Sequence, residues 1–142
     1  MRKARLLVKH TYNFELLGLV STVKDYKMAW LINRDLQLDL RKVADLELEF
    51  VATPNLKISQ YFLSLPHGFV QLLKNKALNP TNQVSYLIPE LESMDYFLLV
   101  QDETLQISID TFVDSLAKNQ LVQKIMKLDV EKLKSKENLL TY

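Results

Sequence analysis

Along the N-terminal part of the chain, the apolar residues change from a continuous run to a helical spacing. Residues 14–20 form a short apolar run with a β-branched end, which is typical of a buried strand. Over residues 28–36 the apolar positions recur at i, i+3, i+4 and i+8, and Tyr26 and Trp30 form an i, i+4 aromatic pair on the adjoining face. We therefore expect a strand followed by a helix over residues 23–34.

A period of two follows, in which apolar and polar residues alternate as they do in strands with one buried and one solvent-facing side. The alternation changes phase in the third of these strands, which predicts a bulge near Ser59 or Gln60. Pro66-His67-Gly68 reverses the chain into a hairpin. Residues 75–83 are polar without a period and predict a loop. The expected strands of this region cover residues 36–40, 46–50, 56–65 and 69–73.

The most continuous apolar run, residues 94–100, predicts a central strand that is covered on both faces. Apolar residues from Ile109 to Ala117 form the clearest helical stripe of the chain, and Ser108 is its expected N-cap. Alternation returns over residues 122–128 and predicts a last strand.

The expected order of elements is β-α-β, a run of strands, and β-α-β again. Such an order packs in layers, so we expect an α+β fold in which two helices cover one face of an antiparallel sheet. It is similar to a ferredoxin-like plait with an extra hairpin inserted in the middle, β-α-β-(β hairpin)-β-α-β. The length of 142 residues fits one domain over residues 1–142.

Composition excludes several classes of protein. With 48% hydrophobic and 25% charged residues, the chain is neither a disordered tail nor a coiled-coil rod. It has no cysteine and only two glycines, which excludes disulfide frameworks, thiol nucleophiles, cysteine-based zinc sites and glycine-rich phosphate loops. No apolar run reaches the roughly 18 residues that span a bilayer, and the basic N-terminus lacks the apolar stretch of a secretory signal. We therefore expect a cytoplasmic protein with no membrane association.

Charge is unevenly distributed along the chain, although the net charge is only +1. Residues 77–117 contain seven acidic side chains and no lysine or arginine, whereas the segments on either side are basic. We interpret these acids as solvated groups that face basic neighbours across the fold. An acidic patch that meets a basic partner or a cation is the alternative.

Candidate catalytic residues are few. His10 and His67 are distant in sequence, and nothing local pairs them. Glu90, Glu92 and Asp95 offer the oxygen ligands that Mg²⁺ or Ca²⁺ takes, but no histidine or EF-hand spacing accompanies them. We expect no enzyme activity, no cofactor and no metal. Nucleic acid is not an expected partner, because the aromatic residues of the predicted central strand have acidic neighbours.

Residues 87–98 read LIPELESMDYFL, and this segment resembles the motif of the IPExxVDY family, small proteins of Bacteroidota without an assigned function. Met94 stands where the family name has valine, and three residues rather than two separate Glu90 from it. Residues 14–18, which lead into residues 25–33, and residues 45–50 and 133–140 are also similar to the family, in the same order. The resemblance implies a bacterial cytoplasmic protein and brings no activity with it. The motif residues of this chain are Ile88, Pro89, Glu90, Met94, Asp95 and Tyr96.

The motif also has a physical interpretation. Proline limits the preceding residue to extended shapes and withholds a backbone donor, so Ile88-Pro89-Glu90 should lead stiffly into the central strand. At the start of that strand the Asp95 carboxylate can accept amide hydrogen bonds, and the Tyr96 ring can cover the core edge. We favour a rigid corner that sets the strand register. A ligand or partner site at the same corner is the alternative.

Two functions of different classes fit the sequence. The first is a non-enzymatic interaction or accessory protein, which self-associates or binds an unknown protein partner through a strand edge within residues 36–50. The second is a small-ligand-binding, ACT-like regulatory module. Its ligand would lie where the first strand meets the first helix, residues 18–25, because a helix N-terminus accepts an anion.

Overall fold

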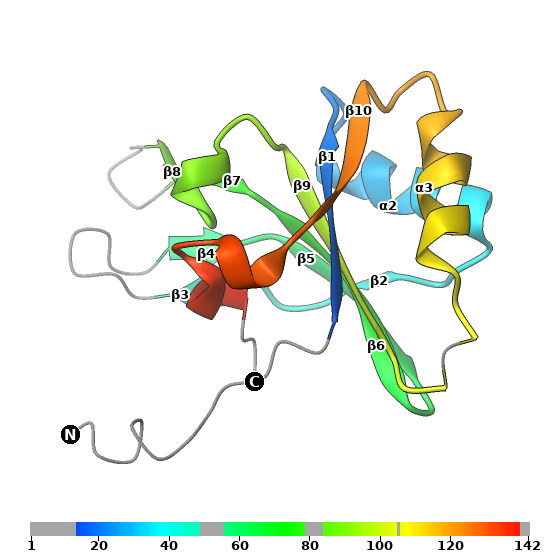
Figure 1. Cartoon of the computed structure of the whole chain (residues 1–142). Coiled ribbons are helices and arrows are strands. Elements are labelled where there is room, and N and C mark those ends of the chain that lie inside the picture. The colour runs from blue at the N-terminus through cyan, green and yellow to red at the C-terminus, as the bar shows by residue number, and fades with distance from the viewer. Residues whose placement is uncertain (1–13, 49–55, 79–83, 105, 140–142) are drawn as a thin grey trace, which may run out of the picture.

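The computed structural model describes residues 14–48, 56–78, 84–104 and 106–139. Its centre is a six-stranded sheet in the order β10-β1-β9-β6-β5-β2, in which every neighbouring pair is antiparallel (Figure 1). The hairpins β3–β4 and β7–β8 lie outside this sheet. The strands are β1 (Glu15–Val20), β2 (Arg41–Lys42), β3 (Leu46–Leu48), β4 (Leu56–Ile58), β5 (Gln60–Leu65), β6 (Gly68–Lys74), β7 (Lys76–Leu78), β8 (Val84–Tyr86), β9 (Tyr96–Asp102) and β10 (Lys124–Leu128).

Helices α2 (Asp25–Leu36) and α3 (Ile109–Ala117) pack against the same face of the sheet (Figure 1). Their buried residues share one core, here the first core, with alternate residues of β1, β6 and β9, because side chains two apart on a strand point to one face. The Ser108 hydroxyl accepts a hydrogen bond from the Thr111 amide and caps α3, as predicted. The α+β class is confirmed for the described residues, which form two α-helices and an antiparallel sheet.

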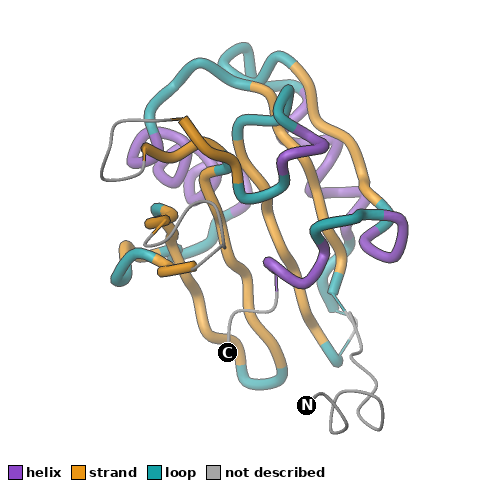
Figure 2. Tube along the Cα trace, turned by 90° about the vertical axis from the view of Figure 1, so that its left-hand side faces the viewer, coloured by secondary structure: helices purple, strands orange, loops and turns teal. Residues whose placement is uncertain are grey.

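The opposite face of the sheet is covered by the two hairpins and by short 3₁₀-helices (Figure 2). Residues from these segments and from the sheet form the second core, which includes Leu16, Leu56, Ile58, Phe97, Leu99, Val130 and Leu139. Because both faces are covered, β9 is buried from Tyr96 to Val100, and the predicted central strand is confirmed. The 3₁₀-helices are η1 (Pro89–Leu91), η2 (Val130–Lys132) and η3 (Lys136–Leu139).

The prediction of a strand over residues 36–40 is wrong. Helix α2 continues to Leu36, and Gln37 ends it in the left-handed conformation with φ of 56°. The Asn33 side chain then accepts a hydrogen bond from the Leu40 amide and donates one to the Leu40 carbonyl. These bonds take the backbone groups that a neighbouring strand would bind, while Leu38 and Leu40 still face the first core. The alternation therefore reports burial and not strand pairing.

Two further predictions differ from the structure around Ser59 and Asn75. In place of a bulge at Ser59, the chain changes sheets: β4 pairs with β3, and β5 begins in the central sheet directly after Ser59. The predicted loop 75–83 contains strand β7, which pairs with β8. Leu46–Leu48 forms β3 as expected. The remaining parts of these predictions, residues 49–50 and 79–83, lie outside the described residues.

Candidate functional site

The motif residues form a turn that leads into β9. Ile88 and Met94 are buried in the second core. Pro89 occupies the first position of η1, where a missing backbone N–H breaks no helical hydrogen bond. The turn therefore has an apolar anchor before and after its exposed part, which includes Pro89 and Glu90.

Asn75, directly after β6, is fully buried and binds this turn from inside. Its side-chain nitrogen donates to the carbonyl oxygens of Leu91 and Met94, both at 2.9 Å. Its side-chain oxygen accepts from the Ile88 amide at 2.9 Å, and its backbone amide donates to the Asp95 carbonyl at 3.0 Å. One residue thus holds both ends of the motif in place.

Asp95 and Tyr96 fasten β9 to the connection between β1 and α2. The Asp95 carboxylate accepts from the Ser21 amide at 2.8 Å, and the hydroxyl of the buried Tyr96 donates to the Val23 carbonyl at 2.7 Å. Burial, together with the nearby carboxylates of Asp25 and Asp95, raises the pKa of Tyr96 well above its ordinary value. These contacts belong to a structural corner, and they favour that interpretation of the motif over a ligand site.

Glu90 binds the C-terminal part of the chain. Its carboxylate oxygens accept from the Ser135 amide at 2.7 Å and from the Ser135 hydroxyl at 2.8 Å. Burial opposes the charged form, but hydrogen bonds, chiefly those from Ser135, outweigh it, so the pKa of Glu90 lies below its ordinary value. Glu90 and Asp95 therefore face different partners. Among the described residues, no three acidic or histidine side chains come together as metal ligands.

Within the described residues, His67 joins no group of potential metal ligands with these carboxylates. His67 is exposed in the turn between β5 and β6. His10 lies outside the described residues.

The N-terminus of α2 is occupied by carboxylates of the chain itself. Asp25, in the first turn, accepts a hydrogen bond from the Tyr26 amide at 2.8 Å, and Asp95 lies on the Ser21 amide just before the helix. An anionic ligand here would meet two negative charges at the helix end that normally attracts anions. The geometry of residues 18–25 therefore does not favour the ACT-like ligand site predicted there.

A polar network ties Asp25 to the point where the chain changes sheets. The Ser59 hydroxyl donates to the Asp25 carboxylate and accepts from Lys42 Nζ at 3.1 Å, and Lys42 also binds Asp45 at 2.9 Å. Burial alone would raise the pKa of Asp25, but the Ser59 bond, a backbone bond, Lys74 and Lys42 outweigh it and lower the pKa. The lowered pKa makes Asp25 a weak base toward the Ser59 hydroxyl, and Lys42 Nζ is ion-paired with Asp45.

Two aromatic side chains are exposed on the outer face of α2. Tyr26 is 63% and Trp30 is 54% exposed, and the guanidinium carbon of Arg34 lies 4.7 Å from the Trp30 ring centre. Residues four apart on a helix share a face, so these three side chains form one stripe. Tryptophan, tyrosine and arginine are the residues most enriched at the energetic centres of protein interfaces.

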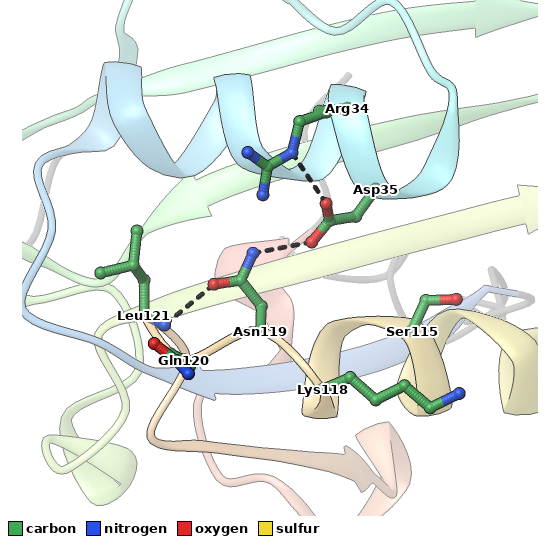
Figure 3. A pocket seen from close by; sticks show the side chains of 7 residues that line it. All are labelled: Arg34, Asp35, Ser115, Lys118, Asn119, Gln120 and Leu121. Atoms are coloured by element: carbon green, nitrogen blue, oxygen red, sulfur yellow. Dashed lines mark hydrogen bonds and ion pairs between the residues drawn. The ribbon is translucent and has the colours of Figure 1, made fainter.

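A groove of about 660 Å³ lies at the end of this stripe, between α2 and the turn that follows α3 (Figure 3). Asp35 accepts from Arg34 Nε at 3.1 Å and from Asn119 Nδ2 at 2.7 Å, which joins α2 to that turn. Leu121 is exposed in the same turn. Because Arg34 belongs to both, stripe and groove form one continuous surface, here called the α2 surface. The groove is lined by Arg34, Asp35, Ser115, Lys118, Asn119, Gln120 and Leu121.

Comparisons with known proteins add nothing to this geometry: no protein-family model, no curated protein and no solved structure matches the chain. Among the helices in the described parts of the chain, none has the length and apolarity needed to cross a membrane. The similarity of residues 87–98 to the IPExxVDY family stays a prediction.

The roles of some of these residues are not predictable from the sequence. Asn75 lies in a polar stretch, and nothing beside it signals burial. The groove joins Arg34 to Leu121, which only tertiary packing brings together. The stripe did leave a signal: Met28, Leu31 and Ile32 fill the core side of α2, so the helical period turns Tyr26 and Trp30 outward.

Proposed function

We propose that this chain is a non-enzymatic interaction or accessory protein that binds a protein partner through the α2 surface. The observation that carries the proposal is the exposure of Tyr26 and Trp30 on a helix whose other side is already packed into the first core. Burying a large apolar side chain is worth about 1.5–3 kcal/mol. A partner that covers both rings therefore gains a useful part of its binding free energy from them.

The chemistry-bearing residues support the same proposal. Ser59, Glu90 and Asp95 are each engaged in hydrogen bonds that join distant parts of the fold. The strand-edge mode predicted within residues 36–50 has less support at β2, because this edge strand is only two residues long and both its residues, Arg41 and Lys42, are exposed cations. Short, charged edges resist pairing with another chain.

The wider context of the proposal rests on resemblance. The resemblance of residues 87–98 to the family motif supports the proposal that the chain is a relative of the IPExxVDY proteins and acts in the bacterial cytoplasm. We also propose kinship with the ferredoxin-like plait. Its support is the strand order β10-β1-β9-β6, in which α2 follows β1 and α3 connects β9 to β10, while β5 and β2 extend the sheet.

Site-specific photo-crosslinking tests the proposed function. A photoreactive residue at Tyr26 in the full chain should yield covalent protein adducts in cells, whereas the same residue at Val84, which is 48% exposed on β8, should not. The adducts at position 26 should be lost when Trp30→Ala is added. Absence of adducts at position 26, or equal yields at both positions, contradicts the proposal.

A further inference from the structure

We propose that the protein partner of the α2 surface is a second copy of this chain, and that the two copies pack helix layer against helix layer about a twofold axis. In each half of this interface, the basic and aromatic face of α2 contacts the acidic outer face of α3 from the other copy. This inference rests on the proposed function and names its partner.

The outer face of α2 presents positive charge beside its aromatic rings. Lys27 and Arg34 are exposed, and Lys24 is exposed directly before the helix. The acidic residues of the same helix are both engaged: Asp25 binds the Ser59 hydroxyl, and Asp35 accepts from Arg34 and Asn119. Arg34 nevertheless keeps 55% of its side chain exposed. An acidic partner surface is therefore the complement of this face.

The outer face of α3 is such a surface. Asp110 and Asp114 lie one turn apart and are exposed, and no lysine or arginine occurs between Ile109 and Ala117. Asp110 is 85% exposed, and its ion-pair partner among the described residues is Lys127 at 3.8 Å, a loose surface pair. The other exposed residues of the helix, Thr111 and Ala117, are small, which leaves room for an aromatic ring to approach.

The arrangement of the two helices allows both contacts at once. α2 and α3 lie side by side on one face of the sheet (Figure 1), and the Asp35–Asn119 hydrogen bond links α2 to the turn that follows α3 (Figure 3). A twofold axis between two such layers sets each α2 on the partner's α3, and such an interface closes as a dimer because both copies use the same patch. The uneven charge of the chain follows the same division, since α2 lies in a basic segment and α3 in the acidic one.

The aromatic residues and the charges have different roles in this dimer. Exposed ion pairs contribute little affinity, so the burial of Tyr26 and Trp30 supplies most of it. The charges set the orientation, because any other pairing of the helices brings like charges together. A dissociation constant on the order of micromolar fits an interface with two aromatic anchors in each half.

Charge reversal followed by mixing tests the proposal, with sedimentation velocity over a range of micromolar concentrations as the measurement. We expect a concentration-dependent dimer for the unmodified full chain. The variants Lys27→Glu/Arg34→Glu and Asp110→Lys/Asp114→Lys should each be monomeric alone. An equimolar mixture of the two should dimerise again, because both halves of the mixed interface regain opposite charges. Trp30→Ala should raise the dissociation constant about tenfold or more, and Val84→Ala should leave it unchanged.

The outcomes separate this inference from the proposed function. All four variants change exposed residues, so unchanged melting temperatures verify that they fold. Any of three results overturns the proposal that the partner is a second copy. The unmodified chain is monomeric, the charge-reversed variants still dimerise alone, or their mixture stays monomeric. If crosslinks at position 26 still depend on Trp30 in that case, the proposed function stands with a different protein. Binding of an RNA oligonucleotide that Lys27→Glu/Arg34→Glu abolishes, in a chain that stays monomeric, overturns both.

Discussion

Replacing Asn75 by alanine removes the buried side chain that holds the motif turn to the end of β6. The Met94 carbonyl and the Ile88 amide lose their partner, whereas the Leu91 carbonyl keeps its bond from the Met94 amide at 2.9 Å. Asn75 has no exposed surface, so water does not reach these groups without a rearrangement.

The expected cost follows from the two groups left without a partner. A buried polar group left without a hydrogen bond costs about 1–3 kcal/mol. Relaxation of the turn recovers part of the sum, so we expect Asn75→Ala to lower the free energy of unfolding by about 2–4 kcal/mol. Asn138→Ala is the matched control, because half-buried Asn138 makes one side-chain bond, to the Leu87 carbonyl at 2.8 Å. Its expected cost is about 1 kcal/mol.

Asn75→Asp adds a pH signature that a general packing defect does not have. One carboxylate oxygen can still accept from the Ile88 amide, but the other faces the carbonyl oxygens of Leu91 and Met94. Burial and these oxygens disfavour the charged form, so the pKa of the new carboxyl rises above its unfolded value of about 3.9. The variant should be closest to the unmodified chain near pH 4 and lose about 1.4 kcal/mol per pH unit as pH rises toward the folded pKa.

Urea unfolding of the three Asn variants and the unmodified chain, repeated at several pH values, measures these differences. A cost for Asn75→Ala no larger than that for Asn138→Ala would refute the clamping role of Asn75. A stability difference between Asn75→Asp and the unmodified chain that does not change with pH would refute the assignment of two carbonyl acceptors to its side-chain nitrogen.

Three further predictions concern single residues. Gly68→Ala should lower the free energy of unfolding by about 2–4 kcal/mol in denaturant melts, because its Cβ would lie 1.8 Å from the Gln101 carbonyl oxygen and φ is 156°. Gln37→Gly should raise stability by about 1 kcal/mol in thermal melts, since Gln37 ends α2 in the left-handed conformation, and Gln37→Ala should give no gain. Alkaline titration by ultraviolet absorbance should find one tyrosine that ionises only as the protein unfolds, and Tyr96→Phe should remove it. Because the folded pKa of Tyr96 is raised, its contribution to stability is full below the unfolded pKa of about 10 and is lost above it.

The elements that the sequence predicts well are those whose period depends on one buried face. In α2 and α3 the apolar stripe is the side that enters the first core, and in β9 apolarity on both faces matches cover on both faces. These patterns report the direction of each side chain, which local geometry fixes.

The wrong predictions arise where the direction in which a side chain points does not determine the hydrogen-bond partner of the residue's backbone. Leu38 and Leu40 alternate with polar residues and face the core. The backbone of Leu40, however, hydrogen-bonds the side chain of Asn33 and not a neighbouring strand. Asn75 carries no period at all, because its role comes from backbone groups of a turn that is remote in sequence. No local pattern encodes such a partner.

The motif and the α2 surface are connected through the segment that precedes α2. Tyr96 binds the Val23 carbonyl and Asp95 binds the Ser21 amide, so the start of β9 fixes the chain just before α2 begins. That attachment sets where the helix starts and hence which side Tyr26 and Trp30 occupy. The buried polar groups of the motif thus act on the helix, while the aromatic residues that the core does not need stay exposed on the surface proposed to bind a partner. This division links the hydrogen bonds of the motif to the proposed interaction surface elsewhere on the molecule.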